Sequence, residues 1–210
     1  MIVLVRHGEA THHTEHLTGG WTDSVLTEHG RYQMEKAGRS LSCYFRNKLL
    51  TTPLRILCSD LRRAQESAKI IAGCLRFRGE LEPYSFLREK CNGQAANLPE
   101  IEAKKIYCRP QSEHDLNHRN YPGGETRQEF FDRTVNGVWE HVDMERENVI
   151  IVAHKGSVQN IVFGWLGMSL EEVCRHNFSI DAQPSSITIL DVNSWKEHSI
   201  LRLNDVSHLW

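Results

Sequence analysis

Two histidines and two arginines have the side-chain types and the local context to do phosphate chemistry. His7 comes directly after an apolar run at the start of the chain, and Arg6 stands beside it. His154 follows a second apolar run, and Arg63 lies shortly after a third. A neutral imidazole is a nucleophile, and a guanidinium group offers paired donors that match phosphate oxygens. Together the four residues predict a site for a phosphate monoester.

The apolar runs are expected to be strands that bring these residues to one place. The runs at 2–5 and 149–153 are continuous and rich in β-branched residues, which is typical of parallel strands covered by helices on both faces, and the run at 54–58 is a third candidate. The carboxyl ends of such strands share one edge of the sheet, where ligands bind in open α/β folds. Six strands are predicted, at residues 2–5, 54–58, 81–86, 149–153, 186–192 and 199–203.

Apolar residues at helical spacing between the strands complete an α/β pattern. We expect a single domain over residues 1–210, folded as a three-layer α/β/α sandwich with a mostly parallel sheet. The least regular stretch, 92–124, is polar and holds three prolines, and we interpret it as an insertion over the active site. The helices are predicted around residues 34–44, 61–75, 126–142, 158–166 and, inside the insertion, 99–106, with Thr126 and Glu129 as a capping box.

The composition argues against several classes of partner. The formal net charge of −2 gives no reason to expect nucleic acid or an anionic membrane, and no apolar stretch approaches the length of a membrane span. The opening run is short and lacks the basic lead of a signal peptide. The six cysteines contain no Cys-x-x-Cys pair, which indicates reduced thiols and a cytoplasmic location. The oligomeric state stays open, with a homodimer as one option.

The segment Arg6-His7-Gly8-Glu9 resembles the signature of the histidine phosphatase superfamily, which includes the cofactor-dependent phosphoglycerate mutases. A four-residue signature alone is weak, but further segments resemble family motifs in the family's order along nearly the whole chain. These segments are 20–24, 26–30, 59–64, 87–93, 122–126, 153–154 and 204–209. The resemblance implies a phosphoglycerate mutase-like fold and an enzyme that needs neither a metal nor another cofactor.

The resemblance also implies a role for each matching residue. His7 would attack phosphorus and become phosphorylated. Arg6, Arg63 and His154 would hold the phosphoryl oxygens and offset the charge of the transition state. Glu89 would protonate the leaving oxygen and then act as a base on the water that hydrolyses the phosphohistidine.

The chain departs from the family pattern at several positions near the signature. Ala10 replaces the usual threonine, and His13 replaces an asparagine that normally donates to phosphate, so His13 is a candidate substitute. Lys155 stands where the family has glycine, and it either adds positive charge at the site mouth or points to solvent. Gly20 and Trp21, in a polar loop near the signature, are candidates to line the substrate mouth.

Two clusters of basic residues allow more than one interpretation. His12, His13 and His16 could bind a metal, but they lack a convincing fourth ligand, so a solvent-facing loop is the favoured interpretation and no metal site is expected. The basic residues of the insertion either meet a second anionic group of the substrate or form a solvated surface. The latter interpretation is slightly favoured for this set, which is Lys104, Lys105, Arg109, His114, His118 and Arg119.

The expected function is a metal-independent phosphomonoesterase acting on a small-molecule phosphate ester through a phosphohistidine on His7. The ester could be a sugar phosphate, a phosphoglycerate or a nucleotide-precursor phosphate. Mutases resembling this chain usually have a longer insertion and an extra C-terminal tail, whereas this chain ends at Trp210, so a phosphatase is favoured over a mutase. A non-catalytic phosphate-binding protein is a third hypothesis, which the presence of all five expected site residues disfavours.

Overall fold

The computed structural model describes residues 1–210 with the exception of 47, 49, 51, 113 and 114. Within this part of the chain one six-stranded sheet forms, in the order β3-β2-β4-β1-β5-β6. β1, β2, β3 and β4 run parallel, and β5 and β6 add two antiparallel strands at one edge. The strands are β1 (Ile2–Arg6), β2 (Leu54–Ser59), β3 (Leu81–Tyr84), β4 (Asn148–Ala153), β5 (Ile187–Val192) and β6 (His198–Asp205).

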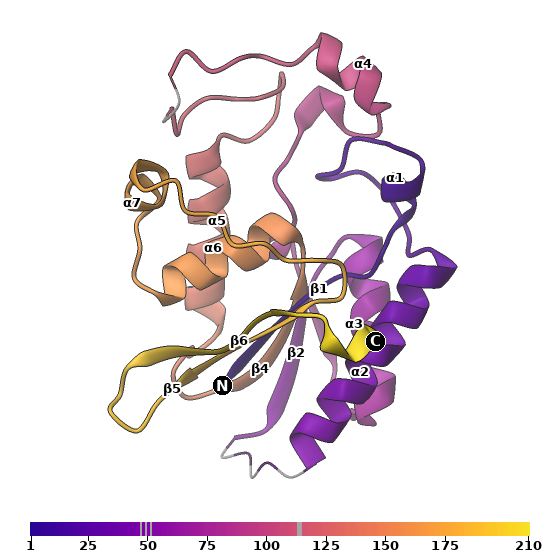
Figure 1. Ribbon diagram of the computed structural model, residues 1–210, viewed down its shortest axis with the longest axis vertical. Helices are drawn as coiled ribbons and strands as arrows, with labels where there is room; N and C mark the ends of the chain where they lie inside the picture. Colours follow the sequence, from indigo (N-terminus) through magenta and orange to yellow (C-terminus); the bar gives the residue numbers. More distant parts are fainter. Residues whose placement is uncertain (47, 49, 51, 113–114) are drawn as a thin grey trace.

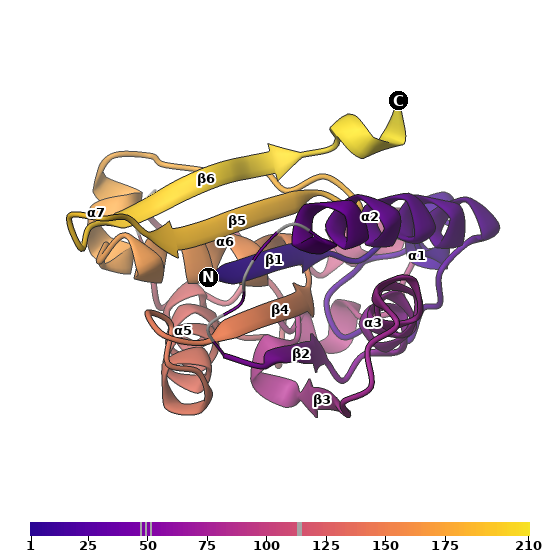
Figure 2. The same ribbon diagram turned by 90° about the horizontal axis from the view of Figure 1, so that it is seen from below.

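Helices cover both faces of the sheet and make it the middle layer of a sandwich (Figures 1 and 2). α2 and α3 pack on one face, and α5 and α6 pack on the other. The expectation of a mostly parallel α/β sandwich is therefore confirmed. The helices are α1 (Thr11–Thr14), α2 (Glu28–Arg46), α3 (Arg62–Leu75), α4 (Glu100–Lys105), α5 (Arg127–His141), α6 (Lys155–Trp165) and α7 (Leu170–Arg175).

The central strand β1 shows why a continuous apolar run forms the middle of this fold. Ile2 and Leu4 face the layer of α5 and α6, whereas Val3 and Val5 face the layer of α2 and α3. All four side chains are fully buried. Each contributes on the order of 1.5–3 kcal/mol through burial of its apolar surface. Packing on both faces therefore fixes the carboxyl end of β1, where Arg6 and His7 lie.

The structure differs from the sequence-based expectation at three elements. The third strand stops at Tyr84 because Ser85–Leu87 turns into a short 3-10 helix. α1 and α7 are short helices that periodicity did not predict. α7 nevertheless begins with a capping box, in which Ser169 and Glu172 each bond to the other's backbone N–H. This motif was the available signal for α7, whereas the four residues of α1 are too few to show a period.

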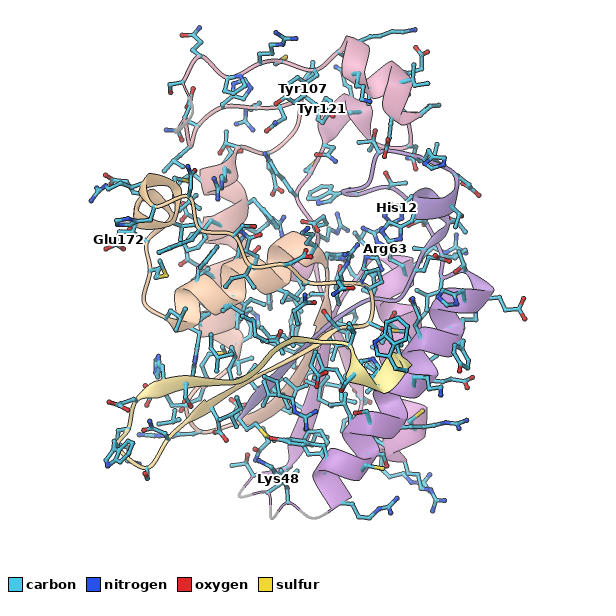
Figure 3. All side chains as sticks on the ribbon, viewed as in Figure 1. His12, Lys48, Arg63, Tyr107, Tyr121 and Glu172 are labelled. Carbon is cyan, nitrogen blue, oxygen red and sulfur yellow. The ribbon has the colours of Figure 1, made fainter. Side chains whose placement is uncertain are left out.

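The stretch 92–124 packs against the loop that follows α1. Leu98 accepts a hydrogen bond from the Thr18 backbone N–H at 2.8 Å, and the Asn97 N–H donates to the Thr22 hydroxyl at 3.0 Å. Within the stretch, Tyr107 and Tyr121 pack edge to face with ring centroids 5.6 Å apart (Figure 3). The stretch thus contacts the loop that carries Gly20 and Trp21.

The six cysteines are free thiols that range from buried to exposed, with Cys74 and Cys91 of intermediate exposure. Cys58 and Cys174 are buried as expected of small apolar side chains, but Cys43 and Cys108 are exposed. The helices in the described part of the chain include none that is both long enough and apolar enough to cross a membrane.

Candidate active site

The four residues that opened the sequence argument meet at the carboxyl ends of β1, β2 and β4. β4 pairs with both β1 and β2, so the residues after these strands become neighbours. The rings of His7 and His154 lie 5.0 Å apart between centroids. Arg63, in the first turn of α3, places its Nε 3.3 Å from Nε2 of His7. Figure 3 shows Arg63 close to these strand ends.

The hydrogen bonds of His7 define its tautomer. Its Nδ1 lies 2.7 Å from the Gly8 carbonyl oxygen, which can only accept, so Nδ1 carries the proton. Nε2 then carries the lone pair, which accepts a hydrogen bond from Arg63 Nε. Burial lowers the pKa of His7 well below its usual value, and the nearby charges of Arg63, His154 and Arg6 lower it further. His7 is therefore a neutral imidazole with a lone pair directed into the site.

Arg63 is fixed in place by the loop before α2. Its Nη1 donates to the Thr22 carbonyl at 2.8 Å and to the Ser24 hydroxyl at 3.2 Å, and its Nη2 donates to the Gly20 carbonyl at 2.7 Å. Burial lowers the pKa of Arg63 to about 10, which still leaves the guanidinium charged at neutral pH. These contacts hold one N–H edge of the guanidinium against His7.

Arg6 supplies a second guanidinium with spare donors. Its Nη1 donates to the Ala182 carbonyl at 2.7 Å, while its buried Nε has no hydrogen-bond partner among the described residues. Burial lowers the pKa of Arg6. A buried cationic donor that is left unpaired is costly unless another group accepts its hydrogen bond, and an anionic ligand would do so.

His154 is likewise buried without protein partners. Both of its ring nitrogens lack a hydrogen bond to any residue that the structure describes. Burial lowers the pKa of His154 well below its usual value, and the charges of Arg63 and Arg6 act in the same direction. His154 is therefore a neutral side chain with an unused N–H donor in the centre of the site.

His13 lies in the site and complements Arg6. The Ala10 backbone N–H donates to His13 Nδ1 at 3.1 Å, so the proton of the neutral ring sits on Nε2. That nitrogen lies 3.1 Å from Arg6 Nη2, which also carries protons. Burial, followed by the charges of Arg6 and Arg63, lowers the pKa of His13 to about 4. Two donors thus converge with no acceptor between them, an arrangement that suits a ligand oxygen.

The expectation of a solvent-facing histidine loop is wrong for His12 and holds for His16. His12 is buried, and its Nδ1 lies 2.9 Å from the hydroxyl of Ser24, which also contacts Arg63. Burial lowers the pKa of His12 to about 3. His16 is exposed. No group of three or more His, Cys, Asp or Glu side chains in the described ranges is arranged to hold a metal ion.

Glu89 reaches the site from the segment after β3. Its Oε1 accepts from the Lys90 backbone N–H at 2.9 Å, and its Oε2 accepts from the Gly156 backbone N–H at 3.0 Å. A Cβ on Gly156 would collide with the carboxylate and with Phe130. The close contact between the Glu89 carboxylate and α6 therefore requires a glycine at position 156, which is one position after Lys155.

The three candidate mouth residues make different contacts. Lys155 Nζ pairs with Asp181 Oδ1 at 2.6 Å, and its side chain is half exposed. Trp21 donates from Nε1 to the Glu89 carbonyl at 2.8 Å, and its ring lies under the Arg88 guanidinium. Gly20 adopts a positive φ of 83° and directs its carbonyl to Arg63. Gly20 and Trp21 thus hold the loop against the residues around the site.

Most of the basic residues of the insertion have partners outside the site. Lys105 pairs with Glu102 at 2.8 Å, and Arg119 pairs with Glu129 at 2.5 Å. His118 bonds to a backbone carbonyl, and Lys104 and Arg109 are exposed. His114 lies outside the described residues. This pattern agrees with the favoured expectation of a solvated surface.

Comparison with known protein families gives a match that covers nearly the whole chain. The model of the histidine phosphatase superfamily (branch 1) matches residues 2–206. Phosphoglycerate mutase-like protein 4 of Arabidopsis thaliana is 30% identical over 166 residues, with 76% of this chain and 68% of that protein covered. The 2,3-bisphosphoglycerate-dependent phosphoglycerate mutase of Cytophaga hutchinsonii is 26% identical, with 100% of this chain and 93% of that protein covered.

Solved structures with the same fold are named as phosphatases. The α-ribazole phosphatase of Shigella flexneri superposes with a TM-score of 0.72 at 22% identity, covering 98% of this chain and 96% of its own. A mycobacterial glucosyl-3-phosphoglycerate phosphatase superposes with a TM-score of 0.73 at 22% identity, covering 97% of each chain. At this level of identity the superpositions establish a shared fold.

Proposed function

The chain belongs to the histidine phosphatase superfamily, and from this premise we propose that it is a metal-independent phosphomonoesterase that works through a phosphohistidine on His7. The observation that carries the proposal is the state of His7, a buried neutral ring whose Nε2 lone pair faces Arg63. A nucleophile must be deprotonated to attack, and burial keeps His7 in that form at neutral pH.

The donors around His7 support an in-line attack on phosphorus. As the bond from His7 Nε2 to phosphorus forms, the bond to the leaving oxygen breaks, and negative charge develops on the three remaining oxygens. Arg6, Arg63 and His154 offer donors to these oxygens, and His13 adds a fourth. Charge stabilisation by fixed donors is usually the largest contribution to such a reaction.

Glu89 is placed to move the protons. In the first step its carboxyl gives a proton to the leaving oxygen. In the second step its carboxylate takes a proton from a water molecule, whose oxygen attacks phosphorus while the bond to His7 Nε2 breaks. Its two backbone contacts, from Lys90 and Gly156, suit the carboxylate form. Glu89 must therefore take up a proton when the negatively charged ester binds.

A mutase is the second candidate, because a relative at 26% identity is named a phosphoglycerate mutase and one at 30% identity is named a phosphoglycerate mutase-like protein. A mutase returns the phosphoryl group to a bound intermediate, whereas a phosphatase releases inorganic phosphate. The solved phosphatases share the fold, and they are named for α-ribazole and for glucosyl-3-phosphoglycerate. We therefore propose a small phosphate ester as the substrate class.

Turnover of p-nitrophenyl phosphate in excess chelator tests the proposal. The wild type should release nitrophenol and inorganic phosphate in equal amounts, and acid quenching should trap an acid-labile phosphoryl group on the protein. His7→Ala should lower kcat by at least about a thousandfold. Equal turnover by both proteins would remove His7 from the mechanism. Tight phosphate binding without turnover would favour a binding protein, and transfer between phosphoglycerates without phosphate release would favour a mutase.

A further inference from the structure

A cavity of about 410 Å³ opens beside Glu89, between the first turns of α5 and α6. We refer to it as the Glu89 cavity. In the proposed mechanism Glu89 faces the leaving oxygen, so the alcohol part of a bound ester extends into this space. A cavity of this volume lies at the small end of the range for ligand sites, which suits an alcohol of a few carbons.

Positive charge dominates the lining of the Glu89 cavity. Lys90, Arg127 and Lys155 all line it, and Glu89 is its one carboxylate among the described residues. Lys155 is paired with Asp181, but among the residues that the structure describes Lys90 Nζ donates only to the neutral amide oxygen of Asn120, at 2.9 Å. Burial lowers the pKa of Lys90 and the neighbouring charge of Arg127 lowers it further, while the charges of Glu125 and Glu89 act in the opposite direction. An anion between Lys90 and Arg127 would relieve this repulsion.

A buried donor without a partner lies on the same cavity. Asn160 lines it from α6, is 7% exposed, and its Nδ2 has no hydrogen bond to any described residue. Buried amide donors are rarely left unpaired, because the lost contact with water is not replaced. Phe130 provides an apolar wall beside these polar groups. The lining therefore combines positive charge, an unused donor and an apolar surface.

We propose that the Glu89 cavity is a subsite for a second anionic group, a carboxylate or a phosphate, on the alcohol part of the ester. Lys90 and Arg127 supply the charge, and Asn160 supplies a hydrogen bond. This inference rests on the proposed function, because it takes Glu89 to mark the leaving-group side. The second anion would then be bound at the first turn of α5 and not by the basic residues of the insertion.

Binding of two matched esters tests the subsite. 3-Phosphoglycerate and glycerol 3-phosphate differ only in a carboxylate that replaces a hydroxymethyl group. Their Kd values are measured by calorimetry in the His7→Ala protein, which should not consume them. We expect 3-phosphoglycerate to bind about tenfold more tightly, since a paired arginine–carboxylate contact is charge-assisted. Arg127→Met should remove most of this ratio and Arg127→Lys should restore part of it, whereas Arg109→Met, at an exposed site in the insertion, should leave it unchanged.

The outcomes separate the subsite from the proposed function. Equal Kd values for the two esters, or a ratio that Arg127→Met leaves intact, would overturn the subsite. If Arg127→Met does not fold by circular dichroism, Arg127→Gln provides the same comparison. Absence of phosphatase turnover in the wild type would refute the proposed function, and the ratio of Kd values would still decide whether the cavity binds a second anion.

Discussion

The two ends of α5 each border a cavity, and the two cavities differ in charge more than in size. The Glu89 cavity, at the amino end, measures about 410 Å³ and is lined by three cations and one carboxylate together with uncharged residues. The cavity at the carboxyl end measures about 510 Å³ and includes four carboxylates, which are Glu140, Asp143, Glu145 and Glu147. An anionic ester is attracted to the first and repelled by the second. Volume alone would have selected the wrong end of the helix.

Hydrogen bonding separates the two ends as clearly as charge does. At the carboxyl end, His198 stacks on Trp165, bonds to its carbonyl at 2.6 Å, and contacts Glu145 at 3.3 Å. At the amino end, the ring nitrogens of His154 and the Nδ2 of Asn160 have no hydrogen-bond partners among the described residues. A folded protein tolerates such unpaired groups mainly where a ligand completes them. The unpaired buried donors thus distinguish the amino end of α5 as the binding site.

The largest difference in activity between the two ends of α5 is expected from replacing one glutamate at each end, Glu89 and Glu145. Glu89→Gln removes the proposed acid and should lower kcat on an alkyl phosphate by about a hundredfold or more. The loss should be smaller on p-nitrophenyl phosphate, because nitrophenolate leaves without a proton. Glu145→Gln, at the other cavity, should leave both rates unchanged. Equal losses of Glu89→Gln on the two esters would contradict a role in leaving-group protonation.

One histidine at each end of α5, the buried His154 and the exposed His198, provides the next test. His154→Ala removes one donor to the phosphoryl oxygens and should lower kcat by about a hundredfold. His198→Ala removes stacking and hydrogen bonds at the other end, so it should lower the Tm and leave kcat within about twofold. Steady-state rates and thermal melts of both variants decide the matter. A loss of kcat in His198→Ala at temperatures where it is folded would show that the two ends are coupled.

The sequence predicted the sheet and the meeting of Arg6, His7, Arg63 and His154 because these depend on strand pattern and on residues at strand ends. Continuous apolar runs determine which strands lie in the centre, and parallel strands place their carboxyl ends together. Such features are local in the chain. They can be predicted without knowing how any loop packs.

The residues that were mispredicted depend on contacts between distant segments. The burial of His12 comes from its bond to Ser24 and from the loop that folds over it, while its polar type favours solvent exposure. The close approach of Gly156 to Glu89 joins two segments 67 positions apart. The sequence did not predict Arg127 as a site residue, because its position on the Glu89 cavity depends on where α5 begins relative to α6. Loop packing of this kind leaves no periodic signal in a sequence.

The smallest expected effect concerns stability, and it follows from the burial of two histidines beside the positive charge of the site. Burial, together with nearby charge, holds the pKa of His12 at about 3 and that of His13 at about 4, below the value of about 6.5 in an unfolded chain. Below pH 6.5 the unfolded chain therefore binds more protons than the folded protein, so stability falls as the pH falls. Above pH 6.5 these groups are neutral in both states and contribute no slope.

Each such histidine lowers the free energy of unfolding by up to about 1.4 kcal/mol per pH unit until the pH reaches its folded pKa. His12→Gln replaces one titrating ring with a neutral amide that can still bond to Ser24. Urea unfolding at pH 6.5 and pH 4.5 should therefore show a smaller loss of stability in His12→Gln than in the wild type. Parallel losses in the two proteins would mean that His12 is already protonated in the folded state at pH 4.5, and that the site accommodates more positive charge than its burial implies.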